Sequence, residues 1–274
     1  MIATAHRGVH ARGAKTVDAA ATRKSSAGSP RGPRRVANAT ASINPGDPSD
    51  HPIWRGVSLV LGHSSPAPME RPMLLVGMLD SPYVRRAAVT ATLLDVPVEH
   101  RSVSVFRHMD EFRAINPLIK APSLVTDAGT VISESLLIIQ HFEDVAGRSL
   151  RPVESAARER DLALTGIAIV AADKAVAIEY ERKRPEAQRY APWQERIVTQ
   201  LHTALDLLDA AAKEGALSAG PELLPCDIAA AIAWGFCRFV IPDVAPAERW
   251  PALAAQAAAC EALEVFKTWP IDRE

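Results

Sequence analysis

The sequence changes abruptly at Met73, and the pattern that begins there restricts the fold more than any other feature. Residues 73–78 form an apolar run of strand length. Ser81-Pro82 follows as a typical helix start, with serine at the N-cap and proline at the first helical position. Apolar residues then recur at helical spacing, and residues 98–103 alternate between apolar and polar side chains. We therefore predict a β-α-β unit that begins at Met73.

A β-hairpin and a further helix complete this first domain. Residues 123–126 and 131–132 flank the sequence Asp127-Ala128-Gly129, which is typical of a hairpin turn. Residues 134–145 have the pattern of a helix, and Gly147 ends it. The order β-α-β-α-β-β-α over residues 73–147 is typical of a thioredoxin-like domain.

The rest of the chain is helical and rich in alanine. Proline and glycine separate four predicted helices, at residues 154–182, 192–213, 227–240 and 251–260. The third helix is apolar nearly all round, so we predict that it is the central buried helix. The predicted fold class is therefore an α/β thioredoxin-like N-terminal domain plus an all-α C-terminal domain over residues 154–274.

Residues 1–72 differ from both domains in composition. They contain ten Lys and Arg against four Asp and Glu, eight of the 21 prolines of the chain, and no sustained hydrophobic period. Such a segment buries too little apolar surface to offset its ordering entropy. We predict a disordered extension. It is also consistent with an over-extended translation start, because Met69 and Met73 both lie just before the first strand.

Several classes of protein are disfavoured by the sequence. The three cysteines lie late in the chain without metal-ligand or disulfide spacing, and the eight histidines form no metal motif. No apolar run reaches the roughly 18 residues that a membrane helix needs. Basic residues after residue 72 are interspersed with acidic ones, which argues against nucleic-acid binding. We expect a soluble cytoplasmic protein without a metal, a membrane or a nucleic-acid partner.

Short stretches of the chain resemble the cytosolic glutathione S-transferase family. They are Ser-Pro-Tyr-Val-Arg-Arg from Ser81, Asn-Pro-Leu-Ile-Lys-Ala-Pro-Ser-Leu from Asn116, and Ser-Glu-Ser from Ser133. Arg184-Pro185-Glu186 and the helix from Asp227 are similar to bacterial members. With serine at position 81, the resemblance is to bacterial enzymes that have a serine-type active site. It extends over residues 73 to 270 or so. It implies glutathione as co-substrate and a homodimer.

The resemblance places Ser81 where the family has its activating hydroxyl or thiol. A hydroxyl that donates a hydrogen bond to a bound thiolate lowers the pKa of that thiol, and the positive end of the helix dipole assists it. The alternative is that Ser81 is an ordinary N-cap serine. Tyr83 is the second candidate for the activating hydroxyl.

The resemblance also implies a cis Ala121–Pro122 peptide bond. The bend exposes the Ala121 N–H and C=O groups, so that the cysteinyl backbone of glutathione can pair with them as an added strand. A trans proline that opens an edge strand is the alternative.

Glu134 and Ser135 open the next predicted helix, whose free N–H groups and dipole favour an anion. By resemblance, Ser135 binds the γ-glutamyl carboxylate and Glu134 receives the ammonium group. Simple helix capping is the other interpretation, and both can hold together. Lys120 and, less securely, His108 or Arg107 are candidates for the glycyl carboxylate.

Two features depart from the family pattern. Many members have Ser or Thr three residues before the aspartate of the buried helix, but this chain has Leu224 before Asp227. Asp227 must therefore find other partners, or that helix end is weaker by about 1 kcal/mol. The serine at position 81 also disfavours the disulfide exchange of relatives that have cysteine there.

These observations predict a glutathione transferase that uses Ser81 to activate the thiol for attack on a small hydrophobic electrophile. We expect Tyr83, residues around Phe106 and the helix at 154–182 to form the electrophile pocket. Two other functions stay open: a glutathione-dependent isomerase or dehalogenase, and a non-catalytic module that binds a protein partner.

Overall fold

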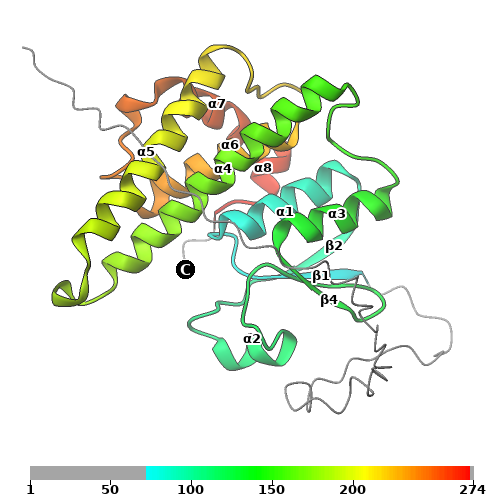
Figure 1. The fold of residues 1–274 in the computed structure, drawn as a ribbon. Coiled ribbons are helices and arrows are strands. Elements are labelled where there is room, and N and C mark those ends of the chain that lie inside the picture. Colours follow the sequence, from blue (N-terminus) through cyan, green and yellow to red (C-terminus); the bar gives the residue numbers. More distant parts are fainter. Residues whose placement is uncertain (1–71, 272–274) are drawn as a thin grey trace, which may run out of the picture. The chain divides into compact units, whose positions relative to one another are not determined.

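A computed structural model describes residues 72–271. The predicted extension at residues 1–72 falls, except for Pro72, outside these residues. The first domain has the predicted order of elements (Figure 1). Its elements are β1 (Met73–Val76), α1 (Pro82–Leu93), β2 (Val98–Arg101), α2 (Met109–Ile115), β3 (Ser123–Val125), β4 (Val131–Ser133) and α3 (Ser135–Ala146).

The four strands form one mixed sheet with the order β2-β1-β3-β4. β1 and β2 are parallel, as the predicted β-α-β unit requires, whereas β3 is antiparallel to both β1 and β4. β1 is two residues shorter than predicted because Gly77 adopts a φ of 137° and leaves the strand. The predicted hairpin and the αL glycine at the end of α3, Gly147, are both confirmed.

Helices cover both faces of this sheet (Figure 1). Leu75 of β1 packs with Val84 of α1 and Phe142 of α3 on one face. The next residue of the strand, Val76, packs with Phe112 of α2 on the opposite face. This alternation follows from the two-residue period of a strand and gives a three-layer domain.

The second domain is all helical, as predicted. It contains α4 (Ser155–Arg182), α5 (Ala191–Lys213), α6 (Pro225–Val240), α7 (Pro251–Glu261) and α8 (Glu264–Thr268), with 3₁₀ turns at Glu186–Gln188 and Ala247–Arg249. α6 contacts α4, α7 and α1, and most of its residues are buried, so it is the central helix. The short helix α8 was not predicted. None of the helices among residues 72–271 is both long and apolar enough to cross a membrane.

Asp227 compensates for the missing hydroxyl residue at the start of α6. Its carboxylate accepts hydrogen bonds from the N–H groups of Ser218, at 2.6 Å, and Leu224, at 2.9 Å. The bond from the Leu224 N–H to Asp227 is the one that the acidic residue of a capping box makes. The Ser218 N–H, in the preceding loop, donates the second bond to Asp227. Burial raises the pKa of Asp227, and these hydrogen bonds oppose the rise.

An ion pair joins the first domain to the end of the second. The buried guanidinium of Arg85 on α1 donates to both carboxylate oxygens of Glu261 on α7, at 2.6 Å each. Its Nε donates to the carbonyl oxygen of Trp269, at 2.7 Å. These bonds join α1, whose N-cap is the predicted active serine, to Glu261 of α7 and to the C-cap residue of α8 near the end of the chain.

Candidate functional site

The register of the sheet brings the three predicted site segments to one end. Val76, at the end of β1, pairs with Ser123, and Ser123 pairs with Ser133 at the end of β4. The loop after β1 leads to Ser81, Pro122 directly precedes β3, and Glu134 directly follows β4. Three segments far apart in sequence therefore meet at the same edge of the sheet.

Ser81 is the N-cap residue of α1, with φ −68° and ψ 122°, and Pro82 occupies the first helical position. Both placements confirm the sequence prediction. The Ser81 side chain, however, makes no capping hydrogen bond. The ordinary capping role therefore does not occupy the hydroxyl, which is left available to a ligand at the positive end of the helix.

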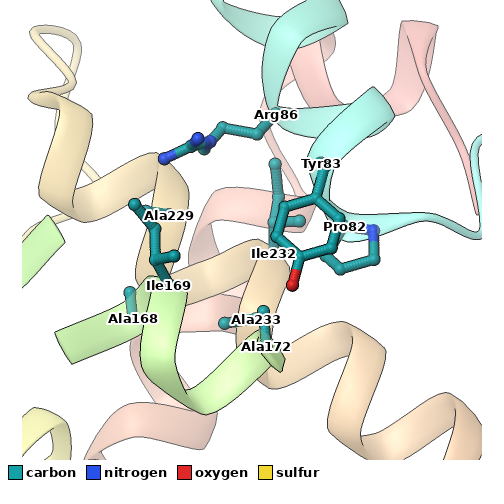
Figure 2. A pocket seen from close by; sticks show the side chains of 9 residues that line it. All are labelled: Pro82, Tyr83, Arg86, Ala168, Ile169, Ala172, Ala229, Ile232 and Ala233. Carbon is teal, nitrogen blue, oxygen red and sulfur yellow. The ribbon is translucent and has the colours of Figure 1, made fainter. Parts of the chain in front are cut away.

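The Tyr83 hydroxyl is already engaged. It donates a hydrogen bond to the carboxylate of Asp173 on α4. Figure 2 shows the ring extending from α1 toward Ala172 of α4. Burial and the Asp173 carboxylate raise the pKa of Tyr83 well above its usual range. Tyr83 is thus a neutral phenol committed to a domain contact, which ranks it below Ser81 as the group that activates a thiol.

The Ala121–Pro122 bond is cis, as expected. The Ala121 backbone N–H and C=O groups make no hydrogen bond within residues 72–271. Close packing fixes this loop, because a Cβ placed on Gly77 would lie only 3.0 Å from the Ala121 Cβ atom. An extended ligand can therefore pair with the Ala121 backbone.

Asn116 holds the start of the same loop against the hairpin. Its buried amide donates to the hydroxyls of Ser123, at 2.7 Å, and Ser133, at 2.9 Å. Ser123 in turn donates to the Lys120 carbonyl oxygen, at 2.7 Å. Sequence reasoning quoted Asn116 only as part of a motif. Its buried position between two strands gives it a structural role.

Glu134 and Ser135 lie at the start of α3. Glu134 is the N-cap and has a positive φ of 73°, an unusual backbone conformation for a residue other than glycine and one that is frequent at functional sites. Its exposed carboxylate forms an ion pair with Lys120, at 3.2 Å. Lys120 therefore lies beside the residue predicted to receive the ammonium group.

Arg86 is a site residue that sequence reasoning missed. It is 5% exposed, and its Nη2 donates a 2.6 Å hydrogen bond to the Ser135 hydroxyl. Burial lowers the pKa of the Arg86 guanidinium to about 10. The signal that could have found it is the pair Arg85-Arg86 within a largely apolar helix, because a buried arginine needs a specific partner.

A small cavity and a larger cleft lie near these residues. The small one in Figure 2, about 10 Å³ between α1, α4 and α6, has room for a single water molecule. The larger cleft, about 570 Å³, is lined by Met78, Asp80, Ser104, Phe106, Arg107, Tyr180 and Lys183. It therefore adjoins Ser81 through Asp80. Phe106 and Tyr180 meet there edge to face, with ring centroids 5.6 Å apart.

This cleft matches only part of the expected pocket. Phe106 and the end of α4 line it, as predicted, whereas Tyr83 lines the small cavity instead.

His108 lies at the start of α2, where its Nδ1 accepts a hydrogen bond from the Ser104 N–H at 3.4 Å. Within residues 72–271, no group of three or more acidic, histidine or cysteine side chains could hold a metal ion.

Comparisons with known proteins agree with this arrangement. Residues 75–149 match the family model of the glutathione S-transferase N-terminal domain. No curated protein matches the chain. Among solved structures, a glutathione transferase family member from Pseudomonas fluorescens Pf-5 with bound glutathione is 26% identical. Its alignment covers 73% of this chain and 99% of that one, with a TM-score of 0.63.

Two other structures support the fold alone. A glutathione S-transferase from Methylobacterium radiotolerans, in complex with glutathione sulfonate, is 24% identical over 74% of this chain and 96% of its own, with a TM-score of 0.65. One from Methylobacillus flagellatus with glutathione bound is 22% identical over 73% and 100%, with a TM-score of 0.65. The described part of the chain thus has the glutathione S-transferase fold, and residues 75–149 carry the N-terminal domain of that family.

Proposed function

We propose that this protein binds glutathione and activates its thiol with the Ser81 hydroxyl for attack on a small hydrophobic electrophile. The observation that carries the proposal is the meeting of three segments at one edge of the sheet. The Ser81 hydroxyl makes no capping bond, and the Ala121 backbone groups are unpaired. Glu134 and Ser135 place an acid and a hydroxyl next to each other at the start of α3. Together these groups suit a thiol peptide. The matched structures from other organisms contain bound glutathione or its sulfonate.

Recognition of the γ-glutamyl group is assigned to the start of α3. The Ser135 hydroxyl accepts a hydrogen bond from Arg86, so its own proton is free to be donated to a carboxylate. The helix N-terminus adds favourable electrostatic interaction with that carboxylate. Glu134 supplies a negative charge beside it for the ammonium group, so the two residues fit the zwitterion of an α-amino acid.

The remainder of glutathione is assigned to the loop at residues 120–122. The cysteinyl backbone pairs with the Ala121 N–H and C=O groups beside Pro122, which directs the thiol toward Ser81. Lys120 is the candidate for the glycyl carboxylate. Because Lys120 pairs with Glu134 at 3.2 Å, we propose that it exchanges this contact for the carboxylate when glutathione binds.

Ser81 keeps its proton in the proposed reaction. The thiol loses its proton to solvent, and the Ser81 hydroxyl stabilises the thiolate with a charge-assisted hydrogen bond. The thiolate then forms a carbon–sulfur bond with the electrophile while the leaving group departs with its bonding electron pair. The cleft beside Asp80, with its aromatic edge at Phe106 and Tyr180, is the proposed electrophile site.

The resemblance also leads us to propose a cytoplasmic homodimer. Light scattering on the purified full-length protein should give twice the chain mass of 29.5 kDa. A mass equal to that of one chain would contradict the dimer without affecting the site.

A comparison of Ser81→Ala with Tyr83→Phe tests the chemistry. With a generic aryl halide at pH 6.5, we expect Ser81→Ala to lower kcat by about 10-fold to 100-fold, because the lost hydrogen bond to a charged group is worth about 1.5–3 kcal/mol. Glutathione affinity should change by less than about threefold, since recognition lies elsewhere. Tyr83→Phe should keep most of the turnover.

Three outcomes would each contradict part of the proposal. Unchanged turnover in Ser81→Ala would remove Ser81 from the mechanism. Mass analysis that finds no thioether would favour a glutathione-dependent isomerase or dehalogenase. Failure of the wild-type protein to bind immobilised glutathione would favour a partner-binding module.

A further inference from the structure

A second cavity, lined in part by the exposed side chains of Leu136 and Leu162, lies between the two domains and away from the proposed electrophile cleft. Its volume is about 40 Å³, and residues from α1, α3, α4 and α6 line it. Four of these residues are polar and more than nine-tenths buried: Thr90 is 4% exposed, Arg86 5%, Asp161 2% and Thr165 8%. The cavity therefore collects buried charged and polar groups.

Three of them, Arg86, Asp161 and Thr165, also have an unpaired side-chain atom. Arg86 Nε, Asp161 Oδ2 and Thr165 Oγ1 have no hydrogen-bond partner within residues 72–271. Gln256 Oε1 is the fourth such buried side-chain atom of the described residues, and Gln256 does not line the cavity. A buried polar atom without a partner is costly, so three around one cavity require a common explanation.

One other atom in each of two of these groups is hydrogen-bonded. Arg86 Nη2 donates to the Ser135 hydroxyl at 2.6 Å, and Asp161 Oδ1 accepts from the Cys226 N–H at the start of α6 at 2.9 Å. These bonds hold each side chain while the unpaired atom stays unsatisfied. Asp161 and Thr165 are one helical turn apart on α4, so their side chains share a face.

The size and chemistry of the cavity select its occupant. A buried water needs about 10–15 Å³ of such space, so 40 Å³ holds two or three water molecules and excludes an organic ligand. The lining carries two cations, Arg86 and Arg151, two anions, Asp161 and Glu143, and the hydroxyls of Thr90 and Thr165. Water is the small molecule that can both accept from Arg86 and donate to Asp161. An ion of either sign would meet a like charge.

We propose that this cavity binds a cluster of ordered water molecules that links Arg86 Nε to Asp161 and Thr165 and thereby fixes the Arg86 guanidinium against Ser135. Asp161 and Thr165 of the helical domain are then positioning residues: through Arg86 they fix the Ser135 hydroxyl of the N-terminal domain. The functional half of this inference rests on the proposed role of Ser135 in binding the γ-glutamyl carboxylate.

A high-resolution crystal structure of the full chain tests the water cluster directly. We expect two or three ordered waters that bridge Arg86 Nε to Asp161 Oδ2 and Thr165 Oγ1. A dry cavity, or a direct ion pair between Arg86 and Asp161, would overturn the proposal. This test does not depend on whether the protein binds glutathione.

Thr165→Val tests the positioning role, because it removes one water partner with little change of shape. We expect an increase in the KM for glutathione of about threefold to tenfold, the size of one lost hydrogen bond, with kcat within about twofold. Thr203→Val is the matched control, since its hydroxyl bonds to the Thr199 carbonyl oxygen on the exposed face of α5. It should leave both constants unchanged.

A ligand without the α-carboxylate separates positioning from general damage. Thr165→Val should not weaken binding of 4-aminobutanoyl-cysteinylglycine, which lacks only that group of glutathione. Equal losses of affinity for both ligands would overturn the positioning role. So would a Thr165→Val effect on the KM for glutathione no larger than that of Thr203→Val. If the wild-type protein binds neither ligand, the proposed function fails, and the crystal structure alone decides the water cluster.

Discussion

The ion pair between Arg85 and Glu261 is the clearest place to test what holds the two domains together. Glu261→Gln keeps the shape of the side chain and removes its charge. The Arg85 side chain is 2% exposed, so its guanidinium would lose the only carboxylate it contacts among residues 72–271. A buried charge without its counter-ion is much less stable than a paired one.

The expected magnitude follows from the exposure of the two partners. Breaking a fully buried pair costs about 3–5 kcal/mol. The Glu261 side chain is 37% exposed, and the Trp269 carbonyl oxygen still accepts from Arg85 Nε, so we expect the lower value of about 2–3 kcal/mol. For a domain of this size that corresponds to a decrease in Tm of about 4–12 °C.

Urea and thermal unfolding followed by circular dichroism measure the effect. Glu264→Gln is the matched control three residues away, because its partner Lys267 is exposed and the Glu264 side chain is 89% exposed. An exposed pair of this kind contributes at most about 1 kcal/mol. Equal free energies of unfolding for Glu261→Gln and Glu264→Gln would refute the argument that burial makes the Arg85 pair important.

Two further predictions follow from the loop and the cysteines. Asn116→Ala removes three side-chain hydrogen bonds, to Ser123, Ser133 and the Leu118 N–H, and should lower the free energy of unfolding by about 1–3 kcal/mol in urea titrations, together with glutathione affinity; wild-type stability would contradict this role. Burial raises the pKa of Cys237 and Cys260 to about 12 and that of Cys226 further. The thiolate fraction at pH 8 is therefore minute, so no thiol should react with Ellman's reagent within minutes unless urea is added; one rapidly reacting thiol would refute it.

Local sequence signals predicted most of the fold. The pair Ser81-Pro82 located the start of α1 because it combines an N-cap with a first-turn proline, and Gly147 located the end of α3 because an αL cap favours glycine. The apolar run that begins at Met73 located strand β1, and the alternating residues from 98 located β2. These signals depend on residues a few positions apart, so one sequence is enough to read them.

Contacts between distant segments could not be predicted in the same way. Arg85 and Glu261 are 176 positions apart, and Tyr83 and Asp173 are 90 apart. Nothing in the local pattern distinguishes Arg85, which joins the domains, from Arg86, which reaches Ser135. Helix periodicity gives the face of a side chain, whereas its partner depends on how the domains pack.

A glutathione titration by isothermal calorimetry tests the central claim most directly. The claim is that Ala121, Glu134 and Ser135 together form a glutathione site. We expect saturable 1:1 binding per chain to the full-length protein, and a loss of affinity of about tenfold or more in Ser135→Ala, which removes a hydrogen bond to a charged group. The absence of binding by the wild-type protein, or unchanged affinity in Ser135→Ala, would contradict the account.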